Sequence, residues 1–189
     1  MALAHDIVPA ELVRPLRRSE YDRMASLGMF RGERIELLYG RLVRMSPRGE
    51  PHAFSITRMT KLFIRALGDR ADVRVQLPLA VSDVSEPEPD LAVVPPGDYL
   101  DGHPRHALLV VEVAESSLDE DRRVKGPLYG AAGIPEYWIV NLVEGVVEIR
   151  RGPHADGYTT TTRHDRGEAL VLPGFPDVSI AVGEIIPAR

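Results

Sequence analysis

Cysteine is absent from the chain of 189 residues, which excludes disulfide bridges and zinc sites built on thiolates. Aromatic residues are scarce, at 6%, although a hydrophobic share of 44% is enough for one ordinary core. No apolar run is long enough to span a bilayer, and the opening "MALAHDIVPAELVRP" lacks the apolar stretch of a signal peptide. We therefore expect a cytoplasmic protein with one globular domain over residues 1–189, preceded within that range by a flexible arm at residues 1–17.

The chain has fewer basic than acidic residues. Lys and Arg number 23 against 28 Asp and Glu, so the formal net charge is −5. This argues against a protein that simply coats nucleic acid. It does not exclude an enzyme acting on DNA, because a nuclease concentrates carboxylates in its site and needs only one basic face. Two clusters are spaced for such a face on predicted helices, although solvated helix faces have the same spacing: Arg58, Lys61 and Arg65, and then Arg122 and Arg123.

Helical and extended patterns alternate along the chain. Helices are predicted at 20–27 after a cap at Ser19, from Pro51 to Gly68, and at 118–132. Strands are predicted around a turn at Tyr39-Gly40, in 72–81, 86–96 and 107–114, on both sides of a loop at 142–145, and in the tail before a final turn at 182–186. This interleaving predicts an α/β fold with a central mixed β-sheet flanked by helices. Gly126-Pro127 is expected to weaken or kink the third helix.

Glu112 interrupts the apolar run "ALLVVEVA". A carboxylate removed from water costs several kcal/mol unless a positive group meets it, and that group is either a structural Arg or Lys or a functional cation. Asp90 opens the preceding apolar strand, where the alternative is a turn residue that caps the strand. If the two strands are neighbours, the two carboxylates meet at one edge of the sheet. Their repulsion would then favour a bridging divalent cation.

Oxygen ligands without cysteine favour Mg²⁺, with Mn²⁺ as a substitute, over Zn²⁺. His103 and His106 form a weaker zinc alternative, because they lie in a Gly- and Pro-rich loop without a third ligand. Lys125 lies in the helix predicted after the strand that holds Glu112. If this helix folds back on its strand, the ammonium group would orient a water molecule and stabilise charge on a phosphate. The alternative is an i,i+4 ion pair with Asp121 on a solvated helix face.

The segments "EPDLAVV" and "LLVVEVAESS", followed by Lys125 and "GIPEYWIV", resemble the Uma-type family of restriction endonucleases, which belongs to the PD-(D/E)XK nuclease superfamily. The likeness extends upstream to "IELLYGRLVRMSP" and "PHAF", and thus covers the chain from about Ser19 to the end. It implies a restriction-endonuclease-like core and Mg²⁺-dependent hydrolysis of DNA.

The resemblance also implies roles for individual residues. Asp90 and Glu112 are the metal ligands it implies, and our mechanistic hypothesis adds the backbone carbonyl of Val113. Lys125 is the catalytic lysine. Two further residues match family positions, Glu36 as an acid from an early element and His52 as a histidine at the start of the next helix. The alternatives are an outward residue of an amphipathic strand for the first and a helix-start residue for the second.

One departure from the superfamily pattern bears on activity. That pattern places the lysine two residues after the acidic residue, where this chain has Ala114, followed by Glu115 and Ser116. The lysine must therefore come from the helix. Two functions stay open: a homodimeric endonuclease that cleaves DNA with a metal-activated water, and a nuclease-fold module that binds DNA or a protein without cleavage. A different Mg²⁺-dependent phosphoesterase is the third alternative, but no small-ligand motif is present.

Overall fold

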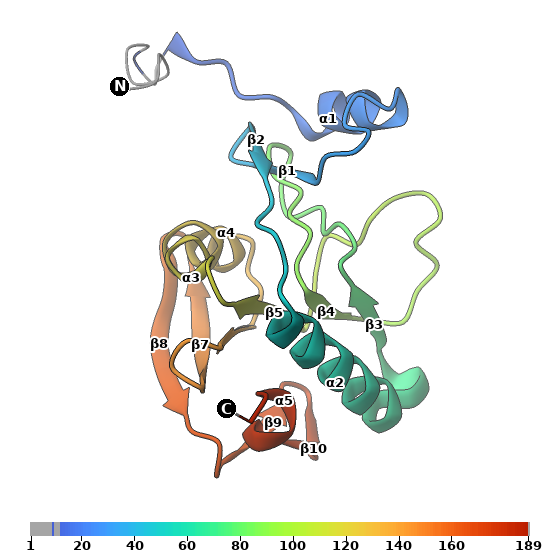
Figure 1. Ribbon diagram of the computed structural model, residues 1–189. Helices are drawn as coiled ribbons and strands as arrows, with labels where there is room; N and C mark the ends of the chain where they lie inside the picture. Colours follow the sequence, from blue (N-terminus) through green and yellow to red (C-terminus); the bar gives the residue numbers. More distant parts are fainter. Residues whose placement is uncertain (1–8, 10–11, 189) are drawn as a thin grey trace.

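The computed structural model describes Pro9 and residues 12–188, and its centre is a six-stranded sheet in the order β3-β4-β5-β6-β7-β8 (Figure 1). Its strands are β3 (Asp72–Val75), β4 (Leu91–Val94), β5 (Leu109–Ala114), β6 (Glu136–Asn141), β7 (Val146–His154) and β8 (Gly157–His164). Strands β5 and β6 are parallel, and the other neighbours are antiparallel. The predicted mixed sheet is therefore confirmed.

Helices cover both faces of this sheet. The helical elements are α1 (Arg18–Ser26), α2 (Glu50–Leu67), η3 (Gly68–Arg70), α3 (Leu118–Glu120), η4 (Asp121–Lys125), α4 (Gly126–Ala131) and α5 (Val182–Ile185). One core contains Met59 and Phe63 of α2 with Val111 and Val113 of β5, and a second contains Tyr129 of α4. None of the helices in the described ranges is long and apolar enough to cross a membrane.

The two cores explain the continuous apolar run in β5. Successive side chains of a strand point to opposite faces, and here both faces are covered. Leu109, Val111 and Val113 belong to the α2 side, whereas Val110 and Ala114 belong to the α4 side. Glu112 has the same parity as the second set. Its carboxylate is therefore directed toward the layer that contains α3, η4 and α4.

Two small hairpins flank the main sheet. The first pairs β1 (Ile35–Leu38) with β2 (Arg41–Arg44), and the second pairs β9 (Ala169–Leu172) with β10 (Phe175–Ala181). The predicted turn lies between β1 and β2, where Tyr39 and Gly40 have φ of 50° and 74°. Two positive φ values in a two-residue hairpin loop match the right-handed twist of the strands. The second hairpin and α5 add apolar side chains to the core beneath α2.

Three boundaries differ from the sequence prediction. Helix α1 begins at Arg18, because the side chain of Glu20 accepts the backbone N–H of Arg17 at 2.9 Å, and Ser19 lies inside the helix rather than capping it. Strand β3 ends at Val75, because Gln76 has a left-handed φ of 52°. The predicted helix at 118–132 consists of α3, the π-helical turn η4 and α4.

Most of the predicted N-terminal arm, residues 1–8 and 10–11, lies outside the described residues. Its last part contacts the first hairpin. The N–H of Leu16 donates to the carbonyl oxygen of Gly40 at 3.0 Å, and Pro15 lies so close to this glycine that a side chain there would collide with it. Glycine is therefore required at position 40 by contact as well as by φ.

Candidate active site

Asp90 and Glu112 meet at one end of the β4-β5 pair. Asp90 directly precedes β4, and Leu91 lies opposite Val111, so the antiparallel register places the two acids side by side. The N–H of Asp90 donates to Oε2 of Glu112 at 3.3 Å, and the N–H of Val113 donates to Oδ2 of Asp90 at 2.9 Å. Asp90 is thus held by backbone contacts to β5 rather than serving only as a turn residue.

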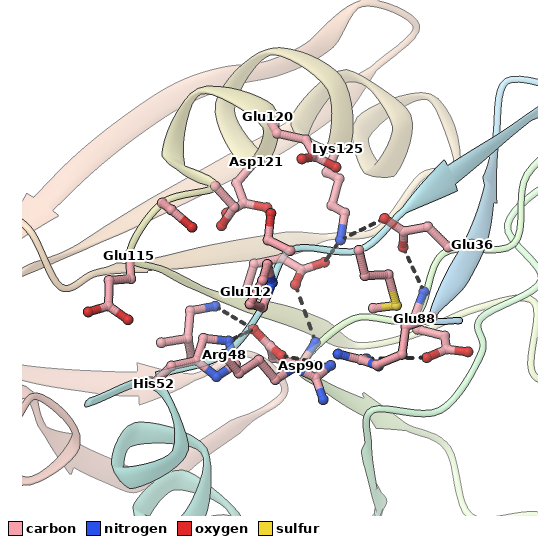
Figure 2. A pocket seen from close by; sticks show the side chains of 17 residues that line it. Glu36, Arg48, His52, Glu88, Asp90, Glu112, Glu115, Glu120, Asp121 and Lys125 are labelled. Carbon is pink, nitrogen blue, oxygen red and sulfur yellow. Dashed lines mark hydrogen bonds and ion pairs between the residues drawn. The ribbon is translucent and has the colours of Figure 1, made fainter. Parts of the chain in front are cut away.

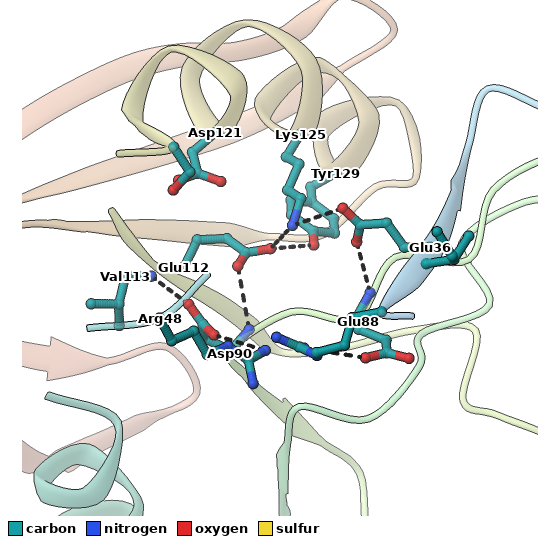
Figure 3. A network of polar contacts seen from close by, with 12 residues as sticks. Glu36, Arg48, Glu88, Asp90, Glu112, Val113, Asp121, Lys125 and Tyr129 are labelled. Carbon is teal, nitrogen blue, oxygen red and sulfur yellow. Dashed lines mark hydrogen bonds and ion pairs between the residues drawn. The ribbon is translucent and has the colours of Figure 1, made fainter. Parts of the chain in front are cut away.

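Glu112 has two donors from the helical layer above it (Figure 3). Its Oε1 lies 3.0 Å from Nζ of Lys125 and accepts the hydroxyl of Tyr129 at 2.9 Å. The same Nζ lies 3.3 Å from Oε1 of Glu36, whose Oε2 accepts the N–H of Glu88 at 3.1 Å. Glu36 is therefore turned into the site and buried, not outward. The structure brings Asp90, Glu112, Lys125 and Glu36 together.

The site contains more buried acidic than basic side chains. Glu36, Asp90, Glu112, Asp121 and Lys125 are all buried. Burial raises the pKa of Glu112 well above its usual range, and the neighbouring carboxylates raise it further against the effect of Lys125. Burial also raises the pKa of Asp121 to about 6. Burial alone would lower the pKa of Lys125, but the surrounding carboxylates outweigh it and raise that pKa.

Asp90 is surrounded by polar side chains from three further segments, of which His52 and Arg48 are labelled in Figure 2. Nε2 of His52, at the start of α2, lies 2.9 Å from Oδ2, and Nε2 of Gln76 donates to Oδ1 at 3.3 Å. Nη2 of Arg48 lies 3.7 Å from Oδ1. Burial acts to raise the pKa of Asp90, but the hydrogen bond and charge of His52, the N–H of Val113 and the charge of Arg48 lower it below its usual value. The acid at this position favours its ionised form.

The π-helical turn η4 explains how Lys125 reaches Glu112. The N–H of Gly126 donates to the carbonyl of Asp121, five residues back. In the same register, the donor for the carbonyl of Arg122 would be residue 127, which is a proline without an N–H. The guanidinium of Arg150 fills this place, because its Nη1 donates to that carbonyl at 2.9 Å. The Gly126-Pro127 pair thus produces a stabilised π turn instead of a simple kink.

Sequence reasoning missed several residues of this site. Gln76 follows β3 in a strained left-handed conformation, and such strain concentrates at functional sites. Tyr129 follows Lys125 by one helical turn, so i,i+4 spacing was the signal that could have revealed it. Arg48 gave no signal, since it lies in an irregular loop. The proposed Lys125–Asp121 pairing on a solvated face is wrong, because both side chains are buried and Oδ2 of Asp121 accepts the hydroxyl of Ser117 at 2.7 Å.

The residues present fit a hard divalent cation. Asp90 and Glu112 provide adjacent carboxylate oxygens in a group with surplus negative charge, and oxygen ligands suit Mg²⁺ and Mn²⁺. Within the described residues, no three His, Cys, Asp or Glu side chains form a complete metal-binding group, so backbone and water oxygens would have to complete the shell. His103 does not suit zinc, because the Arg74 guanidinium, with Nη2 3.4 Å from Nδ1 of His103, contacts this ring nitrogen and its positive charge repels a cation.

A family model described as "Putative restriction endonuclease" matches residues 18–183. The chain belongs to the Uma2 family. The solved structure of "a putative nuclease belonging to DUF820" from Anabaena variabilis ATCC 29413 is similar to it, with a TM-score of 0.71 and 14% identity over 90% of this chain and 97% of that chain. At this identity the likeness shows a shared fold. No match was found among curated proteins.

Ion pairs engage part of each predicted basic cluster in this Uma2 chain, whereas Lys61 and Arg65 of α2 are exposed. On α2, the guanidinium of Arg58 lies 3.6 Å from Glu184 of α5. On η4, Arg122 is paired with Glu148, and its Nη2 lies 3.4 Å from Glu144. Arg123 lies 3.9 Å from Asp119, and both side chains are exposed. These ion pairs reduce the positive charge that either cluster offers to a polyanion.

Proposed function

We propose that this Uma2 protein is an endonuclease that hydrolyses DNA phosphodiester bonds with the help of Mg²⁺, for which Mn²⁺ substitutes. The observation that carries the proposal is the contact of Lys125 with Glu112 beside Asp90, with Nζ 3.0 Å from Oε1 of Glu112. Two acids and one lysine at the edge of a sheet form the constellation that the superfamily pattern requires. The family description and the shared nuclease-like fold support the same activity.

In this proposal Asp90, Glu112 and the backbone carbonyl of Val113 hold the cation. Such a cation, when bound, supplies Lewis acidity that lowers the pKa of a water molecule and offsets negative charge on the phosphodiester. The side chain of Asp90 is already ionised and oriented by its contacts. His52, 2.9 Å away, orients this carboxylate. Binding of a cation therefore costs little conformational entropy at the Asp90 side chain.

Lys125 and Glu36 act on the water and the phosphate. The ammonium of Lys125 donates to Glu112 and Glu36, 3.0 and 3.3 Å away, and its raised pKa keeps it charged over the physiological range. A charged donor at this point positions the attacking water and stabilises the negative charge that develops in the transition state. Glu36 steers that water or a second ion. No covalent intermediate is needed, because water attacks the phosphorus directly.

Two features favour the alternative of a nuclease-fold module without cleavage, the net charge of −5 and the displaced lysine. The second is weakened, because Lys125 reaches Glu112 from the helix. The test incubates purified protein with supercoiled plasmid and Mg²⁺ or Mn²⁺. We expect nicked or linear DNA, suppressed by EDTA and lost in Asp90→Asn. The matched control is Asp101→Asn, the same chemical change in an exposed loop, which retains cleavage.

Three outcomes would contradict the proposal: no cleavage by the wild type, cleavage that persists in EDTA, or full cleavage by Asp90→Asn. Calorimetry with Mn²⁺ separates the two functions. Heat of binding that Asp90→Asn abolishes supports the enzyme, and no binding to the wild type favours the module. A linear product before extensive nicking is the result expected of the proposed symmetric homodimer, because each subunit then cuts one strand.

A further inference from the structure

Two arginines, Arg34 and Arg48, line the active-site pocket, and Figure 2 shows Arg48 on the other side of Asp90 and Glu112 from Lys125. Arg34 immediately precedes β1, and Arg48 lies in the loop between β2 and α2. Nη2 of Arg34 lies 3.6 Å from Oε2 of Glu88, and Nη2 of Arg48 lies 3.7 Å from Oδ1 of Asp90. Both are charge contacts at distances longer than a hydrogen bond. The two guanidinium groups are attracted to these carboxylates without being hydrogen-bonded to them.

Neither guanidinium donates a hydrogen bond to any residue that the structure describes. Other arginines of the chain do, and the guanidinium of Arg14 forms two such bonds with Glu20 at 2.9 Å. The side chain of Arg48 is only 23% exposed and that of Arg34 40% exposed, so their donors are partly removed from water. A partly desolvated cation with unused donors is stabilised by an anionic ligand.

The two cations also lie near one another. Burial lowers the pKa of Arg48, and the positive charge of Arg34 is among the groups that lower it further. Like charges held together in a pocket repel each other, and an anion that touches both relieves the repulsion. Planar guanidinium groups bind phosphate oxygens in pairs of parallel hydrogen bonds, which makes a phosphate group the best-matched anion.

We propose that Arg34 and Arg48 bind a phosphate of the DNA backbone next to the phosphodiester that is cleaved. This inference rests on the proposed endonuclease function and deepens it, because it assigns the side of the pocket, lined by Arg34 and Arg48, along which the substrate strand lies. Asp90 and Glu112 stand between Arg48 and Lys125. A strand held by the two arginines therefore places its next phosphate over Asp90 and Glu112.

The competing location for the substrate is the outer face of α2. Lys61 and Arg65 are exposed there. Helix α2 starts at the pocket with His52 and runs away from it (Figure 1). At about 1.5 Å of rise per residue, Arg65 lies roughly 20 Å along the axis from His52. A duplex bound along this face would depend on Lys61 and Arg65 and not on the pocket arginines.

The experiment compares two double variants that remove the same charge. Binding of a short fluorescein-labelled DNA duplex is measured by anisotropy in Ca²⁺, without Mg²⁺, at several salt concentrations. For Arg34→Gln/Arg48→Gln we expect binding weakened by about tenfold or more, and a slope of log K against log salt reduced by about 1, as for the loss of one phosphate contact shared by both arginines. Lys61→Gln/Arg65→Gln should bind within about twofold of wild type and keep its slope.

Equal losses in the two double variants, or no loss in the first, would overturn the phosphate site while leaving the proposed function intact. Absence of DNA binding and cleavage in the wild type would instead refute the proposed function and this inference with it. Arg48→Lys is expected to recover only part of the affinity, because it keeps the charge without the planar pair of donors. A last binding measurement uses inorganic phosphate in place of DNA. Saturable binding of phosphate without binding of DNA would also overturn the proposal. Thermal melting checks that each variant folds.

Discussion

The ammonium nitrogen of Lys125 lies 3.0 Å from Oε1 of Glu112, although Lys125 belongs to the π-helical turn η4 and Glu112 to strand β5 of the central sheet. The contact restores an acid–lysine pair that the local sequence does not contain, since Ala114 occupies the superfamily's lysine position. A lysine therefore reaches the acid across the β5–α4 crossover. The pair is also a structural element, because both side chains are buried.

Lys125→Met should destabilise the protein in a pH-dependent way. The substitution leaves the buried carboxylates of Glu36 and Glu112 without their ammonium partner, and loss of one partner of a buried ion pair costs about 3 kcal/mol or more. Protonation of the carboxylates reduces this cost, so the loss should be large at pH 8 and smaller at pH 5. Urea denaturation in EDTA at both pH values measures this loss in the free energy of unfolding.

The control for Lys125→Met is Lys61→Met, which removes an exposed lysine and should change stability by less than about 0.5 kcal/mol. An identical loss at the two pH values would contradict this account.

Arg150→Met should destabilise the π turn by about 1–3 kcal/mol, because it leaves the carbonyl of Arg122 without its donor. Pro127→Ala restores an N–H at the position where the chain lacks one. The loss caused by Arg150→Met should therefore be at least halved in a Pro127→Ala background.

A double-mutant cycle measured by urea denaturation tests this coupling between Arg150 and Pro127. Strictly additive losses would show that the guanidinium does not replace the missing amide. Arg150→Lys serves as the control for charge, since the guanidinium also lies 6.0 Å from the ring centroid of Tyr137.

Gly130→Ala should destabilise the protein by about 3 kcal/mol, against the helix propensity that favours alanine by about 1 kcal/mol. A Cβ at this position of α4 would collide with the backbone of Gly157 at the start of β8. Backbone cannot move aside as a flexible side chain does. The control Gly102→Ala places a Cβ in open space and should be near neutral. Thermal melting compares the two variants, and a stabilised Gly130→Ala would refute the close packing of α4 on β8.

The raised pKa of Glu86 predicts that the stability of the protein falls as pH rises. Burial raises the pKa of this carboxyl from 4.5 to about 7, and Asp22 raises it while Arg18, 3.5 Å away, opposes the shift. Between these two pKa values the folded state binds the extra proton, so the free energy of unfolding decreases with increasing pH. Glu86→Gln should remove the part of this dependence that Glu86 contributes, while Asp121 and Glu112 keep theirs, and should stabilise the protein by about 2 kcal/mol at pH 8.

Unfolding followed in EDTA from pH 4.5 to pH 8 checks the contribution of Glu86. The exposed Asp101→Asn should keep the wild-type dependence on pH. A Glu86→Gln profile that runs parallel to the wild type across this range would show that the carboxyl titrates normally in the folded protein.

The sequence predicted the parts of the fold that depend on local periodicity. The apolar run around Glu112 indicated a strand buried on both faces, and the carboxylate within it indicated a cationic partner. It left open whether that partner was structural or functional. The structure identifies the partner as Lys125, which pairs with the acid and to which the proposed function gives the catalytic role.

What the sequence could not predict depends on contacts between distant segments. The predicted cap of α1 at Ser19 is wrong, because Glu20 accepts the N–H of Arg17, so the helix begins at Arg18 and includes Ser19. Gln76 and Arg48 reach Asp90 from segments without periodicity, so only the arrangement of strands and loops reveals them. Such residues are set by tertiary structure and not by propensity.

The π turn has a consequence for the length of the chain at this point. It contains one more residue than an α-helical turn would, and each residue of an α-helix rotates the following side chains by about 100°. Deletion of Val124 would let the segment close as regular α-helix, and Lys125 and Tyr129 could then no longer keep their present directions relative to Ser117 and Asp121. A substitution here removes single contacts, whereas a single-residue deletion would put the two halves of the helical segment out of phase.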